Sequence, residues 1–233
     1  MTITFEPKKV LFWLAVISIC LILANVVILI STYGLHYDRI FAFDRLFNLD
    51  EEHNIPTLFS GSTMLLCSVL MFIISAARKR QGERDFLHWT GLAIIFVFLS
   101  ADETLALHEN IIRPLRNTLH TSGFLYFAWV IPYGILTLAL FIIYLKFLIS
   151  LPPRIRILFI AAGIIYVTGA LGFEILGGYL RGMYEADNIR YAVLTMFEES
   201  LEMTGILIFI YALMSYIDLE LKELSFKIGA VRQ

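Results

Sequence analysis

Charged residues are scarce in this sequence. They make up 16% of its 233 residues, against about 25% in soluble globular domains. The formal net charge at pH 7 is -2, so the chain lacks the basic surplus that is typical of nucleic-acid binding. Cysteine is rarer still. Cys20 and Cys67 each lie inside an apolar run, which excludes a disulfide framework and a thiolate metal motif.

Hydrophobic residues are correspondingly abundant, at 59% of the chain with a mean hydropathy of +0.78. A helix needs about 20 mostly apolar residues to cross a bilayer. The runs that reach this length are residues 10–32, 56–77, 88–109, 123–149, 154–176 and 191–217. We therefore predict an all-α fold, a polytopic transmembrane helical bundle of six spans, formed by a single transmembrane domain over residues 1–233.

The distribution of lysine and arginine predicts the orientation of this bundle. These residues are about twice as frequent in the loops on the side of both termini as in the opposite loops. We therefore expect a multi-pass protein of the inner (plasma) membrane with both termini cytoplasmic. In the first outer loop, residues 38–48 place Ile40, Phe43 and Phe47 on one helical stripe. This stripe predicts either an interfacial helix at headgroup depth or a helix packed within the loop.

Acidic residues gather near the outer ends of the predicted spans. At 1.5 Å per residue, Asp102 and Glu103 would lie roughly 10 Å below the outer surface. Other runs bring Glu174, Glu198, Glu199 and Glu202 to a similar depth. The segment 50–53, Asp-Glu-Glu-His, precedes the second run at the rim. Ionisable residues inside a membrane are costly and usually functional, so this cluster predicts a site that faces the extracytoplasmic side.

Carboxylates crowded in a low dielectric must bind a cation, share protons or pair with arginine. Oxygen ligands with a histidine suit a divalent Zn, Mn, Fe, Mg or Ca ion. The predicted metal ligands are Asp102, His108, Glu109, Glu174 and Glu202. Asp102 and Glu109 are seven residues apart, so on one continuous helix they would share a face. Glu103 and Glu199 are the predicted catalytic residues, as general bases toward water.

Some of these residues also have purely structural explanations. The helix dipole could stabilise Glu198 and Glu199 near a helix N-terminus. Segment 50–52 could be a solvated loop. Asn25, inside the first apolar run, is expected to make a packing hydrogen bond. Small residues in the fifth run predict a face for close helix packing. They are Ala162, Gly163, Gly169, Ala170 and Gly172.

Three acidic motifs occur together: segment 48–56, Asp102-Glu103 with His108-Glu109, and Glu198-Glu199 with Glu202. Their combination resembles a group of uncharacterised bacterial six-span integral membrane proteins with no assigned activity. The resemblance covers most of the chain and implies a membrane fold without implying a reaction.

Two families of membrane hydrolases share only part of this pattern. Glu198-Glu199 is similar to the double-glutamate motif of CAAX-processing membrane proteases, but Met203 stands where those proteins have an arginine. Alkaline ceramidases and their relatives use a late histidine pair for zinc, whereas this chain has no histidine after His120. Neither motif therefore assigns an activity.

Three functional hypotheses follow from the acidic cluster. The first is a metal-dependent enzyme that acts on a lipid or a lipid-linked substrate at the outer headgroup level. The second is a cation or proton-coupled transporter, because carboxylates inside a membrane are typical of such pathways. The third is a non-catalytic membrane sensor or partner-binding protein. In each case the expected partner is membrane lipid, a lipid-like substrate or a cation, and not nucleic acid.

Overall fold

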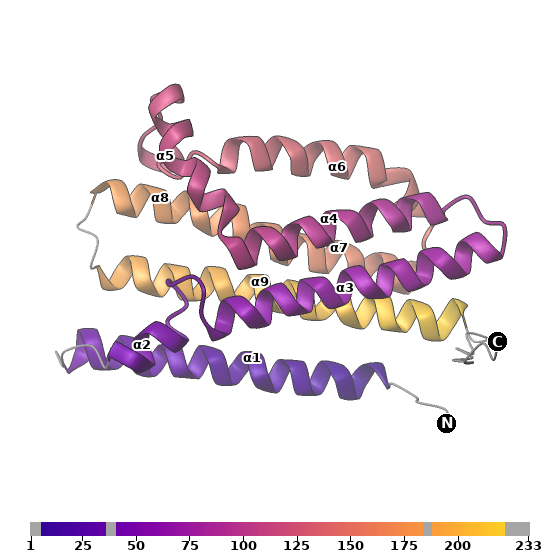
Figure 1. Ribbon diagram of the computed structural model, residues 1–233, viewed down its shortest axis with the longest axis horizontal. Helices are drawn as coiled ribbons and strands as arrows, with labels where there is room; N and C mark the ends of the chain where they lie inside the picture. Colours follow the sequence, from indigo (N-terminus) through magenta and orange to yellow (C-terminus); the bar gives the residue numbers. More distant parts are fainter. Residues whose placement is uncertain (1–5, 36–40, 184–187, 222–233) are drawn as a thin grey trace, which may run out of the picture.

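The structure is a computed structural model that describes residues 6–35, 41–183 and 188–221. This described part of the chain is helical and contains no β-strand (Figure 1). Its elements are α1 (Pro7–Leu29), the π-helical segment η1 (Ile30–Gly34), α2 (Phe41–Phe47), α3 (Ile55–Arg80), α4 (Phe86–Leu105), α5 (Leu107–Leu119), the 3-10 turn η2 (Gly123–Leu125), α6 (Val130–Ser150), α7 (Pro153–Val167), the π-helical segment η3 (Thr168–Phe173), α8 (Glu174–Met183) and α9 (Ile189–Glu220).

Six helical stretches are long and apolar enough to cross a membrane. They are Pro7–Gly34, Ile55–Arg80, Phe86–Leu105, Val130–Ser150, Pro153–Met183 and Ile189–Glu220. This finding confirms the predicted all-α bundle with six spans. The start of α1 and the end of α9 lie at the same end of the bundle (Figure 1), and the cytoplasmic location of the termini stays a prediction.

The apolar core occupies the end of the bundle that carries the start of α1 and the end of α9. Helix α9 contacts α1, α3, α7 and α8. Met71 of α3, Trp89 of α4 and Ile210 of α9 are completely buried in one cluster there. Aromatic and aliphatic side chains fill this end of the bundle, and the acidic side chains of the spans gather toward the opposite end.

Close packing between α7 and α9 depends on small residues. Ala162 of α7 and Gly169 of η3 are buried, as the packing face predicted for the fifth run requires. A Cβ atom at Gly169 would lie 2.8 Å from the carbonyl oxygen of Glu198. Gly163, in contrast, is exposed and nothing lies within 4 Å of its Cβ position. The helix-packing face therefore includes Ala162 and Gly169 but not Gly163, which the prediction had included.

Two predicted runs are interrupted in the structure. Run 88–109 is divided at Ala106, whose left-handed backbone (φ 49°, ψ 46°) ends α4 and starts α5. The expectation that Asp102 and Glu109 share one continuous helical face was therefore wrong. In run 123–149, η2 precedes the spanning helix α6, which begins only at Val130. In the predicted interfacial helix 38–48, residues 38–40 lie outside the described residues, and α2 forms the part that is described.

We predict that Gly205→Ala destabilises the bundle while Gly163→Ala does not. A Cβ at Gly205 would lie 2.8 Å from both the backbone nitrogen and the Cβ of Tyr166. Overpacking of this kind costs about 1–3 kcal/mol, whereas the matched change at Gly163 enters open space. Thermal unfolding of both variants in detergent measures the difference. Equal midpoints for the two variants would contradict the close α7–α9 contact.

Candidate metal centre

The site begins at the break between α4 and α5. Ala106 is buried and left-handed, a conformation that costs a residue with a Cβ roughly 1–2 kcal/mol. The turn brings the backbone N–H of His108 to 2.9 Å from Oδ1 of Asp102, which accepts its hydrogen bond. Asp102 therefore satisfies a free N–H in the first turn of α5, as capping carboxylates do. Backbone strain of this sort persists where the surrounding structure imposes it.

Asp102 also orients the imidazole ring of His108. Nδ1 of His108 lies 3.2 Å from Oδ2 of Asp102, and the hydroxyl of Tyr133 donates to Oδ1 at 3.0 Å. Both oxygens of this buried carboxylate are therefore engaged. Burial lowers the pKa of His108, but the hydrogen bond and the negative charge of Asp102 outweigh burial, and the net shift is upward. This pairing leaves Nε2 as the ring nitrogen available to a ligand.

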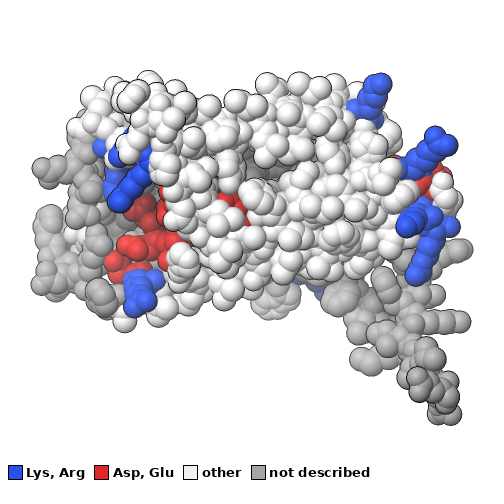
Figure 2. Space-filling model, turned by 45° about the horizontal axis from the view of Figure 1, so that its top comes forward, with Lys and Arg blue, Asp and Glu red and all other residues white. Residues whose placement is uncertain are grey.

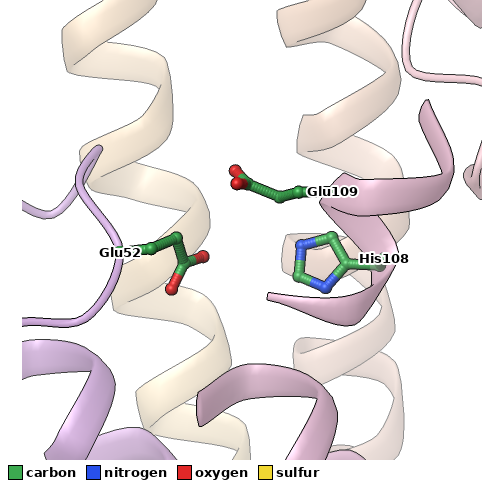
Figure 3. Close-up of side chains that lie close together, drawn as sticks. All are labelled: Glu52, His108 and Glu109. Carbon is green, nitrogen blue, oxygen red and sulfur yellow. The ribbon is translucent and has the colours of Figure 1, made fainter. Parts of the chain in front are cut away.

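Two further carboxylates face His108. One ligand atom each from Glu52, His108 and Glu109 lie within 4.8 Å of one another. Figure 3 shows Glu52 facing the imidazole across a gap, with one ring nitrogen turned toward this gap and the other turned away, and the side chain of Glu109 extending over the same gap. Burial raises the pKa of Glu52, and the neighbouring charge of Glu109 adds to this effect. A histidine whose other nitrogen is held by a carboxylate is the usual form of a metal-binding imidazole.

Glu52 reaches this position because its loop is fixed by asparagines. The buried Asn25 of α1 accepts a hydrogen bond from the backbone N–H of Leu49 at 3.1 Å. Asn54 donates to the carbonyl oxygens of Asn48 and Glu51, each at 2.6 Å. Asn54 also accepts from the N–H of Thr57 and so caps α3. The loop that precedes α3 is therefore attached both to α1 and to the start of its own helix.

A cavity of about 140 Å³ connects these groups. Most of its charged lining is acidic: Asp50, Glu52, Asp102, Glu103, Glu109, Glu174, Glu198, Glu199 and Glu202. The space-filling view shows acidic atoms gathered in a hollow at one end of the molecule (Figure 2). Asp50 is exposed at the mouth, yet desolvation by the protein around it raises its pKa to about 6, against the opposing effect of Arg181.

Glu174 is placed by the π-helical segment η3, which interrupts the fifth span. Such segments occur often at functional sites, because the extra residue in the turn redirects the side chains that follow. Glu174 is the first residue of α8 and accepts a hydrogen bond from Nε1 of Trp129 at 2.7 Å. The ring of Trp129 also packs against that of His108, with the centroids 4.7 Å apart. Trp129 therefore links Glu174 to His108.

The structure places the predicted residues in one cavity but gives them different surroundings. All of the predicted metal ligands and both predicted catalytic residues line it. His108 and Glu109 belong to the group of three possible ligands with Glu52. Asp102 is instead paired with Nδ1 of His108. The assignment of ligands and bases therefore stays a prediction, and the geometry favours Glu52 in the place of Asp102.

The sequence places Glu52 at the rim of the acidic cluster but does not identify it as a ligand, because it precedes a helix start where a solvated loop is an alternative. It predicts no role for Trp129 or Tyr133, which lie in an apolar run. Asn25 indicates only that a buried amide in a span needs a partner, and the sequence does not identify that partner as the loop that carries Glu52. No pattern in the sequence indicated the contacts of Trp129 and Tyr133.

Residues 13–217 match the family described as a domain of unknown function, DUF8692. The chain belongs to this family. The match agrees with the resemblance to membrane proteins that have no assigned activity. No curated protein and no solved structure matches the chain. The chemistry of this DUF8692 member must therefore be inferred from the cavity itself.

We predict that Asn25→Leu destabilises this DUF8692 chain by about 1–3 kcal/mol, the usual cost of a buried N–H group left without a partner. The N–H is that of Leu49, itself buried. Thermal unfolding in detergent measures the effect. Asn117→Leu, at an exposed position of α5, is the matched control and should leave the midpoint unchanged. A midpoint for Asn25→Leu equal to that of wild type would mean that the loop is held by other contacts.

Proposed function

We propose that this protein is a membrane-embedded metalloenzyme that hydrolyses a lipid or a lipid-linked substrate at the outer headgroup level. One observation carries the proposal. Asp102 pairs with Nδ1 of His108, and one ligand atom each of Glu52, His108 and Glu109 lie within 4.8 Å of one another. A set of one nitrogen and two carboxylates suits Zn, Mn or Fe, because Mg and Ca prefer oxygen ligands alone. The metal would supply Lewis acidity to water and to an ester oxygen.

The remaining carboxylates of the cavity supply the acid–base chemistry in this proposal. Glu103 of α4 and Glu199 of α9 line the cavity together with the three proposed ligands. Either one could take a proton from water and return it to the leaving group. The apolar residues Leu99 and Leu171 line the same space, and such a lining suits a lipid whose reacting bond lies just below the membrane surface.

A second candidate function is favoured by one feature of α9. Glu198, Glu199 and Glu202 lie within about one turn and a half of this spanning helix, and all three line the cavity. Acidic side chains ordered by depth are typical of cation and proton pathways. Uptake of Mn²⁺ or protons by sealed proteoliposomes would support transport and contradict the enzyme proposal.

We predict that purified wild-type protein binds about one divalent metal ion per chain. Elemental mass spectrometry after reloading and desalting measures the content. Glu52→Ala and His108→Ala should lose the metal, and Asp102→Asn should weaken its binding by about 10–100-fold through the loss of a correctly held imidazole. Glu51→Ala, an exposed neighbour that does not line the cavity, is the matched control. Metal-free wild type, or metal retained in Glu52→Ala, would overturn the proposed centre.

We predict that Glu199→Gln keeps the metal and lowers turnover by about 10²–10⁴-fold, the usual contribution of a general base. Glu220→Gln, exposed at the end of the same helix, is the control. The assay follows release of products from phosphatidic acid, phosphatidylglycerol and ceramide in mixed micelles. A metal-loaded wild type that hydrolyses none of these lipids would count against the enzyme, and unchanged turnover in Glu199→Gln would remove this residue from catalysis.

A further inference from the structure

One wall of the cavity is formed by α8 and α9, which lie side by side (Figure 1). Tyr191, Thr195 and Glu198 of α9 line the cavity. Their spacings of four and three residues place them on one face of the helix. Glu174 of α8 also lines the cavity and is hydrogen-bonded to Glu198. We call Glu174, Thr195 and Glu198 the α8–α9 wall.

The hydroxyl group of Thr195 indicates a ligand at this wall. Thr195 is only 8% exposed, and its hydroxyl makes no hydrogen bond to any residue that the structure describes. On the same helix, the hydroxyls of Ser200 and Thr204 donate to the carbonyl oxygen four residues earlier, which is a usual partner of such a group. A buried hydroxyl without a partner is unfavourable. Because Thr195 lines the cavity, a polar group of a ligand can satisfy it.

The charge of the wall selects a cation. A hydrogen bond between the carboxyl groups of Glu174 and Glu198 needs one proton, which leaves one negative charge on the pair. Nε1 of Trp129 donates to Glu174 at 2.7 Å but adds no charge. None of the described lysines and arginines lines the cavity. A divalent ion held by Glu52 and Glu109 would be neutralised by those two carboxylates, so it would not compensate the wall.

The other cavity residues favour an organic cation over a second metal ion. Leu99, Val167 and Leu171 line the cavity, and all three belong to spanning stretches. A hard metal ion binds oxygen ligands and gains nothing from these side chains, whereas an alkyl chain packs against them. Ammonium groups are also attracted to aromatic rings. The aromatic residues of the lining are Phe127, Trp129, Tyr133, Tyr166 and Tyr191.

We propose that the α8–α9 wall binds the protonated primary amine of a lipid headgroup. A primary ammonium group has three N–H donors and no acceptor. One N–H would donate to the hydroxyl of Thr195, and another to the carboxylate shared by Glu174 and Glu198. As an assignment of the substrate class, this inference rests on the proposed function. The wall holds the lipid in place, and the three proposed metal ligands lie outside it.

The test measures binding to the full-length protein in detergent at pH 7 by isothermal titration calorimetry. The probes are oleylamine, oleyl alcohol, which lacks the charge, and oleyltrimethylammonium, which lacks N–H donors. We expect oleylamine to bind at least about tenfold more tightly than oleyl alcohol. Thr195→Val should weaken oleylamine binding by about tenfold and leave oleyltrimethylammonium binding unchanged. Thr204→Val, at an exposed position of the same helix, is the matched control and should bind like wild type.

Two further variants separate binding from folding. Thr195→Ser keeps a hydroxyl and should keep the affinity for oleylamine. Glu174→Gln with Glu198→Gln removes the charge of the wall and should abolish the preference for the amine. Equal binding of oleylamine and oleyl alcohol by wild type, or unchanged oleylamine binding in Thr195→Val, would overturn the inference. So would a preference that persists in the double glutamine variant.

Two more measurements define the class of ligand and its relation to the metal. Soluble propylamine bound as tightly as oleylamine would overturn the assignment to a lipid. Metal content is measured on the same samples by elemental mass spectrometry. Wild type that binds metal without preferring the amine would contradict the inference alone. Wild type that prefers the amine but binds no metal would contradict the metalloenzyme and support the amine site.

Discussion

The Asp102 carboxylate accounts for most of the architecture at the polar end of the bundle. It is buried in a membrane-spanning helix, where an uncompensated charge is very unfavourable. Its compensation comes from the backbone of His108, the ring of His108 and the hydroxyl of Tyr133. The first of these contacts depends on the left-handed turn at Ala106, and the second orients the imidazole. One acidic group therefore contacts the start of α5, the imidazole of His108 and helix α6.

The six spans were accessible from sequence because hydrophobic length is a strong physical constraint. A helix that crosses a bilayer must hide its backbone polar groups and be apolar over its length. This constraint correctly predicted six spans, and the acidic residues that it grouped together line one cavity in the structure. The break at Ala106 was not accessible, because the local sequence offers neither glycine nor proline to mark it. Only the contact between Asp102 and the turn that follows explains it.

The sequence predicted which acidic residues line the cavity, but it did not predict that Glu52 lies beside His108 and Glu109. Hydropathy gives the depth of Glu103, Glu174 and Glu199, but not which side chains face each other around the bundle. Glu52 enters the group through a loop whose position depends on Asn25, far away in the chain. Such a link is a tertiary contact, and one sequence carries no direct trace of it.

Helix α6 makes few buried contacts with the rest of the six-span bundle. Only Val130 and Phe147 of α6 are buried. At the end near the cavity this helix is attached through Tyr133 to Asp102, and the adjacent Trp129 is attached to Glu174. At the other end, the hydroxyl of Tyr144 donates to the carbonyl oxygen of His88. The cavity thus supplies part of the anchorage of a whole helix, so its occupancy and the stability of the fold are thermodynamically linked. A ligand that draws these carboxylates together would also draw this end of α6 toward the bundle, while Tyr144 and the buried Phe147 hold its other end.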